Sequence, residues 1–196
     1  LNFDIYSEQT TVRGEYRVRR NPGADIAGSW RLDGRDMTLR ALEIDGVPVA
    51  DRDYECDDTG LTLYGLADAF TLVVETAIDP EKNLSLEGFY RSGDILCSQC
   101  EATGFSRIVY FPDRPDVMAR YSTTITASRA SCPVMLSNGN RVAEEDLGDG
   151  RHRVRWEDPY PKPSYLFALV AGDLRAHRGR FTTASGREVA LEIWVE

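Results

Sequence analysis

The stretch TTVRGEYRVRR, residues 10–20, indicates which kind of fold the chain adopts. Apolar or small side chains alternate with charged ones along it, so that Val12, Tyr16 and Val18 share one side and Arg13, Arg17 and Arg19 share the other. Successive side chains of an extended strand point to opposite faces of a sheet, whereas a helical stripe recurs about every 3.6 residues. We therefore predict a strand here that is buried on one face.

The same alternation recurs in four further stretches, which are LTLYGL (61–66), FTLVVETAI (70–78), GRHRVRWED (150–158) and VALEIWVE (189–196). Turn-forming pairs such as Asp45–Gly46 and Asn138–Gly139 separate them. Regularly spaced strands with polar turns are typical of antiparallel sheet proteins. We predict an all-β fold, an antiparallel β-sandwich or saddle-like domain with at most short helical turns. The best candidate for such a turn begins at Pro115.

Length and composition describe an ordinary folded domain. The chain has 196 residues, of which 42% are hydrophobic and 28% charged, which suffices to bury a core in one domain. Lys and Arg number 23 against 32 acidic residues, a net charge of -9, so we expect no nucleic-acid partner. The apolar run from Tyr165 reaches only half of the roughly 20 residues that a membrane-spanning helix needs. We therefore expect no membrane association.

The chain contains four cysteines, which are Cys56, Cys97, Cys100 and Cys132. The C-x-x-C spacing of Cys97 and Cys100 is half of a zinc ribbon or a redox pair, but the first needs a second pair of ligands and the second a helix start. Neither context is present, and neither His152 nor His177 lies in metal-ligand spacing with a cysteine. We predict no metal ligand in this chain. The cysteines are interpreted as the reduced thiols of a cytoplasmic protein, and the first residues lack the features of a secretion signal.

The stretch QCEATGFSRIVYFPDRPD, residues 99–116, fits neither a plain helix nor a plain strand. In an extended chain Gln99 and Glu101 would face one side and Cys100 the other. From the residues alone, the pair is either part of a binding site or ordinary polar sheet surface. For Arg107 and Asp113 we predict a structural role, as an ion pair or as partners of turn backbone.

No arrangement of catalytic residues is visible in the sequence. A zinc-binding H-E-x-x-H, a glycine-rich phosphate loop and a dinucleotide fingerprint are all absent, and no Ser or Cys carries the glycine frame of a nucleophile elbow. We predict no catalytic residue in this chain. Taken alone, it is a binding or scaffold domain.

Three long stretches stand out, which are LEGFYRSGDILCSQCEATGFSRIVYFPDRPDVMARY (86–121), LSNGNRVAEEDLGDGRHRVRWEDPYPKPSYLFALVAGDL (136–174) and FTTASGREVALEIWVE (181–196). They resemble the N-terminal domain of the zinc aminopeptidases of the aminopeptidase N family, in particular the bacterial alanyl type. The likeness extends over essentially the whole chain. It implies one all-β domain, residues 1–196, that packs on a thermolysin-like catalytic domain of the same parent chain.

The resemblance also implies a role for Gln99 and Glu101. They match a Q-x-E motif of the family that reaches the active site, where the glutamate holds the free α-amino group of the peptide substrate. An ammonium in a partly buried pocket needs a carboxylate partner, and an amide oxygen supplies a further acceptor. Gln99 and Glu101 are thus the predicted substrate-binding residues.

The catalytic motifs of the family, G-A-M-E-N and H-E-x-x-H, do not occur in this chain. We therefore expect it to be the N-terminal part of a longer enzyme, whose catalytic zinc domain and later domains lie outside these residues. Zinc is then a cofactor of the parent, and this segment alone is expected to be inactive. The alternative is a stand-alone, non-catalytic β-sandwich interaction module. The gene sequence beyond Glu196 distinguishes these two hypotheses, because it contains either the G-A-M-E-N and H-E-x-x-H motifs or a stop codon.

Overall fold

The computed structural model describes residues 1–21, 23 and 28–196, which form an almost entirely β structure. Its strands are β1 (Asn2–Ile5), β2 (Thr10–Arg19), β3 (Ser29–Asp33), β4 (Thr38–Ile44), β5 (Val47–Pro48), β6 (Tyr54–Asp57), β7 (Gly60–Tyr64), β8 (Ala69–Ile78), β9 (Gly88–Ser92), β10 (Ile95–Gln99), β11 (Ala119–Ser128), β12 (Val134–Ser137), β13 (Asn140–Asp146), β14 (Arg151–Lys162), β15 (Leu169–Gly172), β16 (Arg175–Thr182) and β17 (Glu188–Val195). Short 3-10 turns cover Asp51–Asp53, Gly104–Arg107 and Ser164–Leu166. The prediction of an all-β fold with short helical turns is confirmed. No helix among the described residues is long and apolar enough to span a bilayer.

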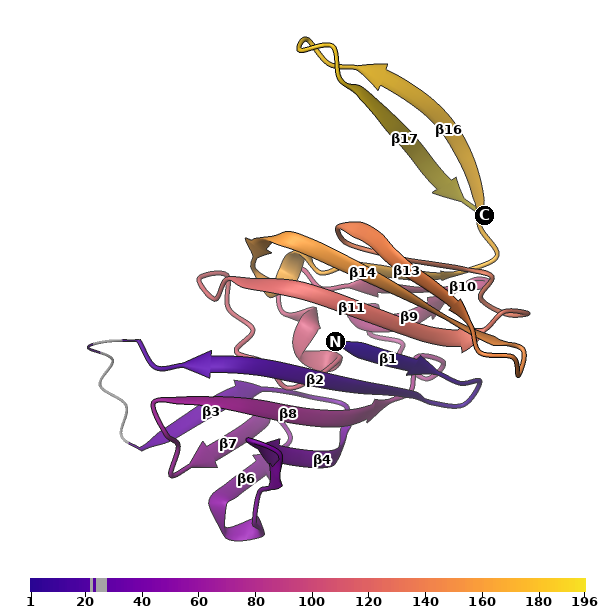
Figure 1. Cartoon of the computed structure of the whole chain (residues 1–196). Coiled ribbons are helices and arrows are strands. Elements are labelled where there is room, and N and C mark those ends of the chain that lie inside the picture. The colour runs from indigo at the N-terminus through magenta and orange to yellow at the C-terminus, as the bar shows by residue number, and fades with distance from the viewer. Residues whose placement is uncertain (22, 24–27) are drawn as a thin grey trace.

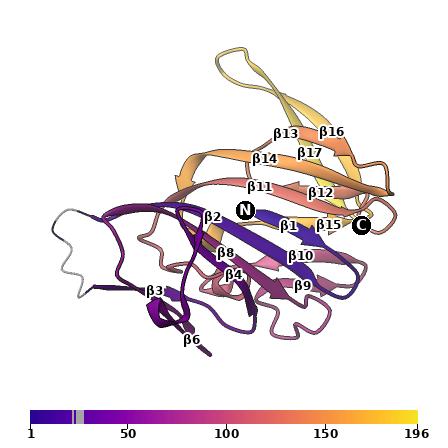
Figure 2. The ribbon, with the colours of Figure 1, turned by 60° about the horizontal axis from the view of Figure 1, so that its bottom comes forward.

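The described strands assemble into four sheets. The largest has eight strands in the order β13-β14-β11-β1-β2-β8-β4-β5 and runs across the middle of the molecule (Figures 1 and 2). A four-stranded sheet, β12-β15-β10-β9, and a three-stranded sheet, β3-β7-β6, are the smaller ones. The hairpin β16–β17 forms a sheet of its own and projects away from the rest of the fold (Figure 1).

The alternation in residues 10–20 produces strand β2, which pairs antiparallel with β8 from Thr10 opposite Ile78 to Arg19 opposite Ala69. Val12 on β2 is fully buried, whereas Glu15, which points to the other face, is exposed. The predicted turn at Asp45 and Gly46 joins β4 to β5 with φ values of 50° and 77°. Two successive left-handed residues make the two-residue hairpin loop that Asp-Gly favours.

Two details differ from the sequence prediction. Strand β1 pairs parallel with β11, Asn2 opposite Thr124, and antiparallel with β2. The long connection between β1 and β11 permits this, since parallel neighbours need a crossover that a tight turn does not supply.

No helix forms at Pro115, because β11 already begins at Ala119 and leaves room for a single hydrogen-bonded turn.

The core lies between the eight-stranded sheet and the two smaller sheets and draws side chains from all three. At its centre the ring of Phe105 meets those of Phe111 and Phe167, at 5.2 and 5.3 Å between centroids, and Phe167 stacks on Phe3 at 5.8 Å. Phe105 belongs to the turn Gly104–Arg107. Burying a phenylalanine contributes roughly 1.5 to 3 kcal/mol, so this ring holds the turn against the core.

Candidate functional site

Gln99 and Glu101 lie where β10 ends and the chain enters the turn that Phe105 anchors. Gln99 is opposite Gly88 of β9. The side chains of Gln99 and Glu101 are exposed while Cys100 between them is buried, so the predicted division of this stretch between two sides is confirmed. The Gln99 side-chain amide donates from Nε2 to the carbonyl oxygen of Glu101 at 3.2 Å. The peptide bond between Glu101 and Ala102 is cis.

The polar groups of this pair are open to a ligand. Gln99 donates through Nε2 to the backbone, and its Oε1 accepts no hydrogen bond from the described residues. Within residues 1–21, 23 and 28–196, the Glu101 carboxylate makes neither a hydrogen bond nor an ion pair. One anionic and one neutral acceptor two residues apart form an arrangement that suits a cation carrying several N–H donors.

Close backbone packing fixes the turn that carries Glu101. The N–H of Gly104 donates to the carbonyl of Cys100 at 2.8 Å. A Cβ atom on Gly104 would lie 2.3 Å from the carbonyl oxygen of Gln99 and 2.9 Å from the nitrogen of Gly88. Glycine at position 104 therefore lets the turn approach β9 and β10 more closely than any other residue allows.

Side chains from distant parts of the sequence hold the same turn. Arg35 donates from Nη2 to Thr103, at 3.1 Å to the carbonyl and 2.8 Å to Oγ1. Asp113, only 6% exposed, accepts the N–H of Ser106 at 2.9 Å and the hydroxyl of Ser164. The prediction that Asp113 binds turn backbone is confirmed. Sequence reasoning missed Arg35, because nothing in its own neighbourhood signals a contact with residues about 70 positions away.

Arg107 has a structural role, but not through Asp113. Its guanidinium donates from Nε to Glu87 at 3.1 Å and pairs with Asp36 through Nη1. Burial, together with the nearby Arg35, lowers the pKa of Arg107. The two carboxylates balance a charge that is largely removed from water, so Arg107 ties the β9 end of the site to the segment after β3.

Among the described residues, no group of three or more His, Cys, Asp or Glu side chains is placed to hold a metal ion. Cys100 is buried at 2% exposure and Cys97 is half-buried. Burial raises the pKa of Cys100 to about 12, which opposes the deprotonation that zinc ligation requires. The donors of this part of the chain do not fit a zinc ion.

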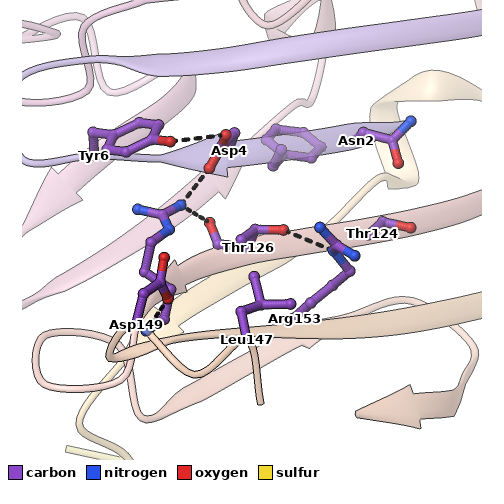
Figure 3. A pocket seen from close by; sticks show the side chains of 10 residues that line it. Asn2, Asp4, Tyr6, Thr124, Thr126, Leu147, Asp149 and Arg153 are labelled. Atoms are coloured by element: carbon purple, nitrogen blue, oxygen red, sulfur yellow. Dashed lines mark hydrogen bonds and ion pairs between the residues drawn. The ribbon is translucent and has the colours of Figure 1, made fainter. Parts of the chain in front are cut away.

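A hollow of about 610 Å³ lies on strands β1, β11 and β14, away from Gln99 and Glu101, and is lined by residues such as Asp4, Thr126 and Arg153 (Figure 3). Its most buried cation, Arg151, pairs with Asp4 and lies 4.1 Å from the ring centroid of Tyr6. Arg153 donates to Thr126 at 3.3 Å. Arg151 pairs with Asp4 and Arg153 with Glu145 at 3.3 Å, so both cations that line this hollow already have a carboxylate partner.

Comparison with known proteins defines the class of this chain. The sequence profile of the peptidase M1 N-terminal domain matches residues 1–166. The chain is 46% identical to aminopeptidase N of Escherichia coli (strain K12) and 49% identical to aminopeptidase N of Caulobacter vibrioides, in both cases over all of this chain and 22% of the relative. The chain therefore belongs to the peptidase M1 N-terminal domain family. It spans about a fifth of the length of these curated relatives.

Solved structures share the fold. A crystal structure of Legionella pneumophila aminopeptidase A in complex with aspartic acid superposes with a TM-score of 0.90 at 34% identity, covering 98% of this chain and 23% of that chain. A zinc metallopeptidase of the same class from Deinococcus radiodurans superposes with a TM-score of 0.79 at 16% identity, covering 97% and 45%. The resemblance inferred from the sequence is confirmed at the level of the family.

Proposed function

We propose that this chain is the substrate-binding and scaffolding N-terminal domain of a zinc aminopeptidase, which releases N-terminal amino acids from peptides. The relatives that match the whole chain are named aminopeptidase N, and each carries the matching region as 22% of a longer protein. This favours a domain of a longer enzyme over a stand-alone interaction module. The Legionella structure, an aminopeptidase with aspartic acid bound, supports a ligand that carries a free α-amino group.

The proposed role of Glu101 is to bind the α-ammonium of the substrate, with Gln99 Oε1 as a second acceptor. The observation that carries this is the exposed Glu101 carboxylate, which has no partner in the described part of the chain although the turn beneath it is firmly anchored. An unpaired carboxylate on an anchored backbone can form a charge-assisted contact with an ammonium without first breaking an existing ion pair. Zinc chemistry belongs to the parent outside these residues.

This arrangement would select the end of a peptide. An internal peptide bond has no ammonium to offer Glu101, so binding it would leave the carboxylate without a partner in a site closed by the catalytic domain. Seating the amine also fixes where the first peptide bond lies relative to the catalytic groups. Substrate recognition by this domain would thus determine that the enzyme removes one residue at a time.

The proposed partners are a peptide with a free N-terminal amine and the catalytic domain of the same parent chain. The proposed location is the cytoplasm. It is supported by four free cysteines, none of them in a disulfide among the described residues, since thiols persist in reducing compartments.

The proposal is tested by changing Glu101 in the full-length parent. We expect Glu101→Ala to lower kcat/KM for aminoacyl substrates by roughly 30-fold to 1000-fold, because a lost contact between a carboxylate and an ammonium costs about 2 to 4 kcal/mol. Glu101→Gln keeps the shape of the side chain and removes its charge, so we expect it to lower kcat/KM nearly as much as Glu101→Ala does. Steady-state kinetics on a chromogenic substrate measures both, with zinc content checked in parallel.

Two controls make this test specific. Asp94→Ala removes another exposed carboxylate, just before the other end of β10, and should leave kcat/KM within about twofold of wild type. On a substrate whose α-amino group is blocked, Glu101→Ala should cause little further loss. If Glu101→Ala retained activity on free-amine substrates to within about twofold, Glu101 would be an ordinary surface residue.

A further inference from the structure

The hairpin β16–β17 carries all of its large exposed hydrophobic side chains on one face, which they share with Arg175 and His177. Residues directly opposite each other in an antiparallel pair share a face. The register places Phe181 opposite Val189, Gly179 opposite Leu191, His177 opposite Ile193 and Arg175 opposite Val195. We call Phe181, Val189, Leu191, Ile193 and Val195 the apolar face of the hairpin.

Most of the apolar face is open to water in this chain. Phe181 is 56% exposed, Leu191 48%, Ile193 63% and Val195 53%. Val189 alone is half-buried. All of the large hydrophobic side chains that the hairpin exposes therefore lie on one side.

The opposite face of the hairpin is polar and internally satisfied. Arg178 pairs with Glu192 at 2.9 Å and Arg180 with Glu188 at 3.3 Å. The indole of Trp194 donates to Glu192 at 3.2 Å, and the guanidinium of Arg178 lies 5.8 Å from its ring centroid. The charged and polar groups of this face have partners and favour contact with water, whereas the exposed hydrophobic side chains of the apolar face favour burial.

An apolar face of this kind needs a covering surface. An isolated two-stranded hairpin is at best marginally stable in water, and this one stands away from the sheets (Figure 1). Contiguous exposed apolar patches on folded proteins usually mark an interface. The stability of the hairpin would then come from whatever covers Leu191 and Ile193.

We propose that the apolar face docks on the part of the parent chain that lies outside these 196 residues. This inference rests on the proposed function, since the occupant exists only if the chain belongs to a longer enzyme. The aminopeptidase N relatives align with this chain over its full length, hairpin included, and continue over more than three quarters of their own length. The family profile ends at residue 166, before β16 begins at Arg175. The hairpin thus lies outside the residues that the family profile matches.

A second copy of the chain is the less favourable occupant. The net charge of -9 opposes self-association. A neighbouring domain of the same polypeptide, by contrast, is held at high effective concentration by the chain connection itself. An intramolecular docking surface therefore needs less apolar area than a stable dimer.

The docking is tested in the full-length parent by thiol labelling at two adjacent positions. Leu191→Cys lies on the apolar face and Ala190→Cys on the polar face, and both positions are exposed in this chain. We expect an alkylating reagent to modify Leu191→Cys at least tenfold more slowly than Ala190→Cys. Mass spectrometry of the tryptic peptides separates these sites from other cysteines, and rates in denaturant correct for intrinsic reactivity.

Equal labelling of the two variants, to within about twofold, would show an open face and overturn the proposal. Protection that increases with protein concentration, together with a dimeric mass in sedimentation, would assign the face to a second copy and overturn it as well. Should Leu191→Cys misfold, Ile193→Cys, which is 63% exposed in this chain, is compared with Ala190→Cys instead. Labelling does not depend on amine binding, so adding Glu101→Ala should leave the protection unchanged, and failure of one proposal remains distinct from failure of the other.

Discussion

Single residues around the candidate site are divided between those that are exposed to solvent and those that hold the turn. Glu101 is exposed, whereas Cys100 next to it is buried with 2% of its surface exposed, and Asp113 is buried with 6% exposed. The burial of Cys100 between exposed Gln99 and Glu101 matches the expectation for an extended chain, although β10 ends at Gln99 and Glu101 already lies in the turn. The hydrogen bonds of Arg35 to Thr103 were not, because they depend on how two distant segments pack.

The thiols provide a test at this scale. Cys56 is exposed, whereas burial raises the pKa of Cys100 to about 12 and also raises that of Cys132. At pH 8 a thiol with so high a pKa is ionised to only about one part in 10,000, and alkylation requires the thiolate. We expect iodoacetamide to modify Cys56 and leave Cys100 and Cys132 unmodified in the folded chain, as measured by peptide mass spectrometry.

Denaturant is the control for this labelling, since all four cysteines should then react. Rapid modification of Cys100 in the folded chain, or a disulfide between Cys97 and Cys100 under mild oxidation, would contradict its assignment as a buried structural thiol. The C-x-x-C pair would then have to be considered as a redox site.

At the scale of elements, the site depends on a turn that packs against two strands. The strands themselves were predictable: the period-two stretches became β2, β7, β8, β14 and β17. The parallel pairing of β1 with β11 was not, since local patterns do not specify which strand becomes a neighbour. The sequence prediction placed a helical turn at Pro115 and missed the one at Gly104–Arg107, because the latter depends on packing between distant segments. It is Phe105, buried in the aromatic core, that places the turn at Gly104–Arg107 rather than at Pro115.

Two glycine substitutions separate close packing from intrinsic propensity. A Cβ at Gly104 would lie 2.3 Å from the Gln99 carbonyl oxygen, whereas a Cβ at Gly179 in β16 meets nothing within 4 Å. We expect Gly104→Ala to lower the free energy of unfolding by about 1 to 3 kcal/mol. Gly179→Ala should be neutral or stabilising by up to about 1 kcal/mol, because alanine restricts the unfolded chain.

Urea unfolding at unchanged m-value measures both variants. In the parent enzyme, Gly104→Ala should also weaken substrate binding, because it moves the backbone that carries Glu101. Equal stability of the two alanine variants would mean that the turn yields without cost and does not fix the position of Glu101.

At the scale of the whole molecule, the domain joins a packed body to a projecting hairpin (Figure 1). Composition and periodicity predict the strands of the body, because alternating apolar and polar residues show which face of each strand is buried. The hairpin strands were predictable in the same way. Their exposed apolar face was not, because period two shows which residues share a face but not whether another surface covers it.

The division of labour within the proposed parent enzyme leads to a prediction about zinc. We expect the purified 196-residue chain, freed of any tag, to bind well below one zinc ion per molecule. A structural zinc needs about four thiolate, imidazole or carboxylate ligands, and the described residues bring no three such groups together. A chelator should leave the melting temperature of the chain unchanged, whereas the same treatment should abolish peptide hydrolysis by the parent. Elemental analysis that found one zinc per chain, lost on Cys97→Ser substitution, would instead make Cys97 a metal ligand.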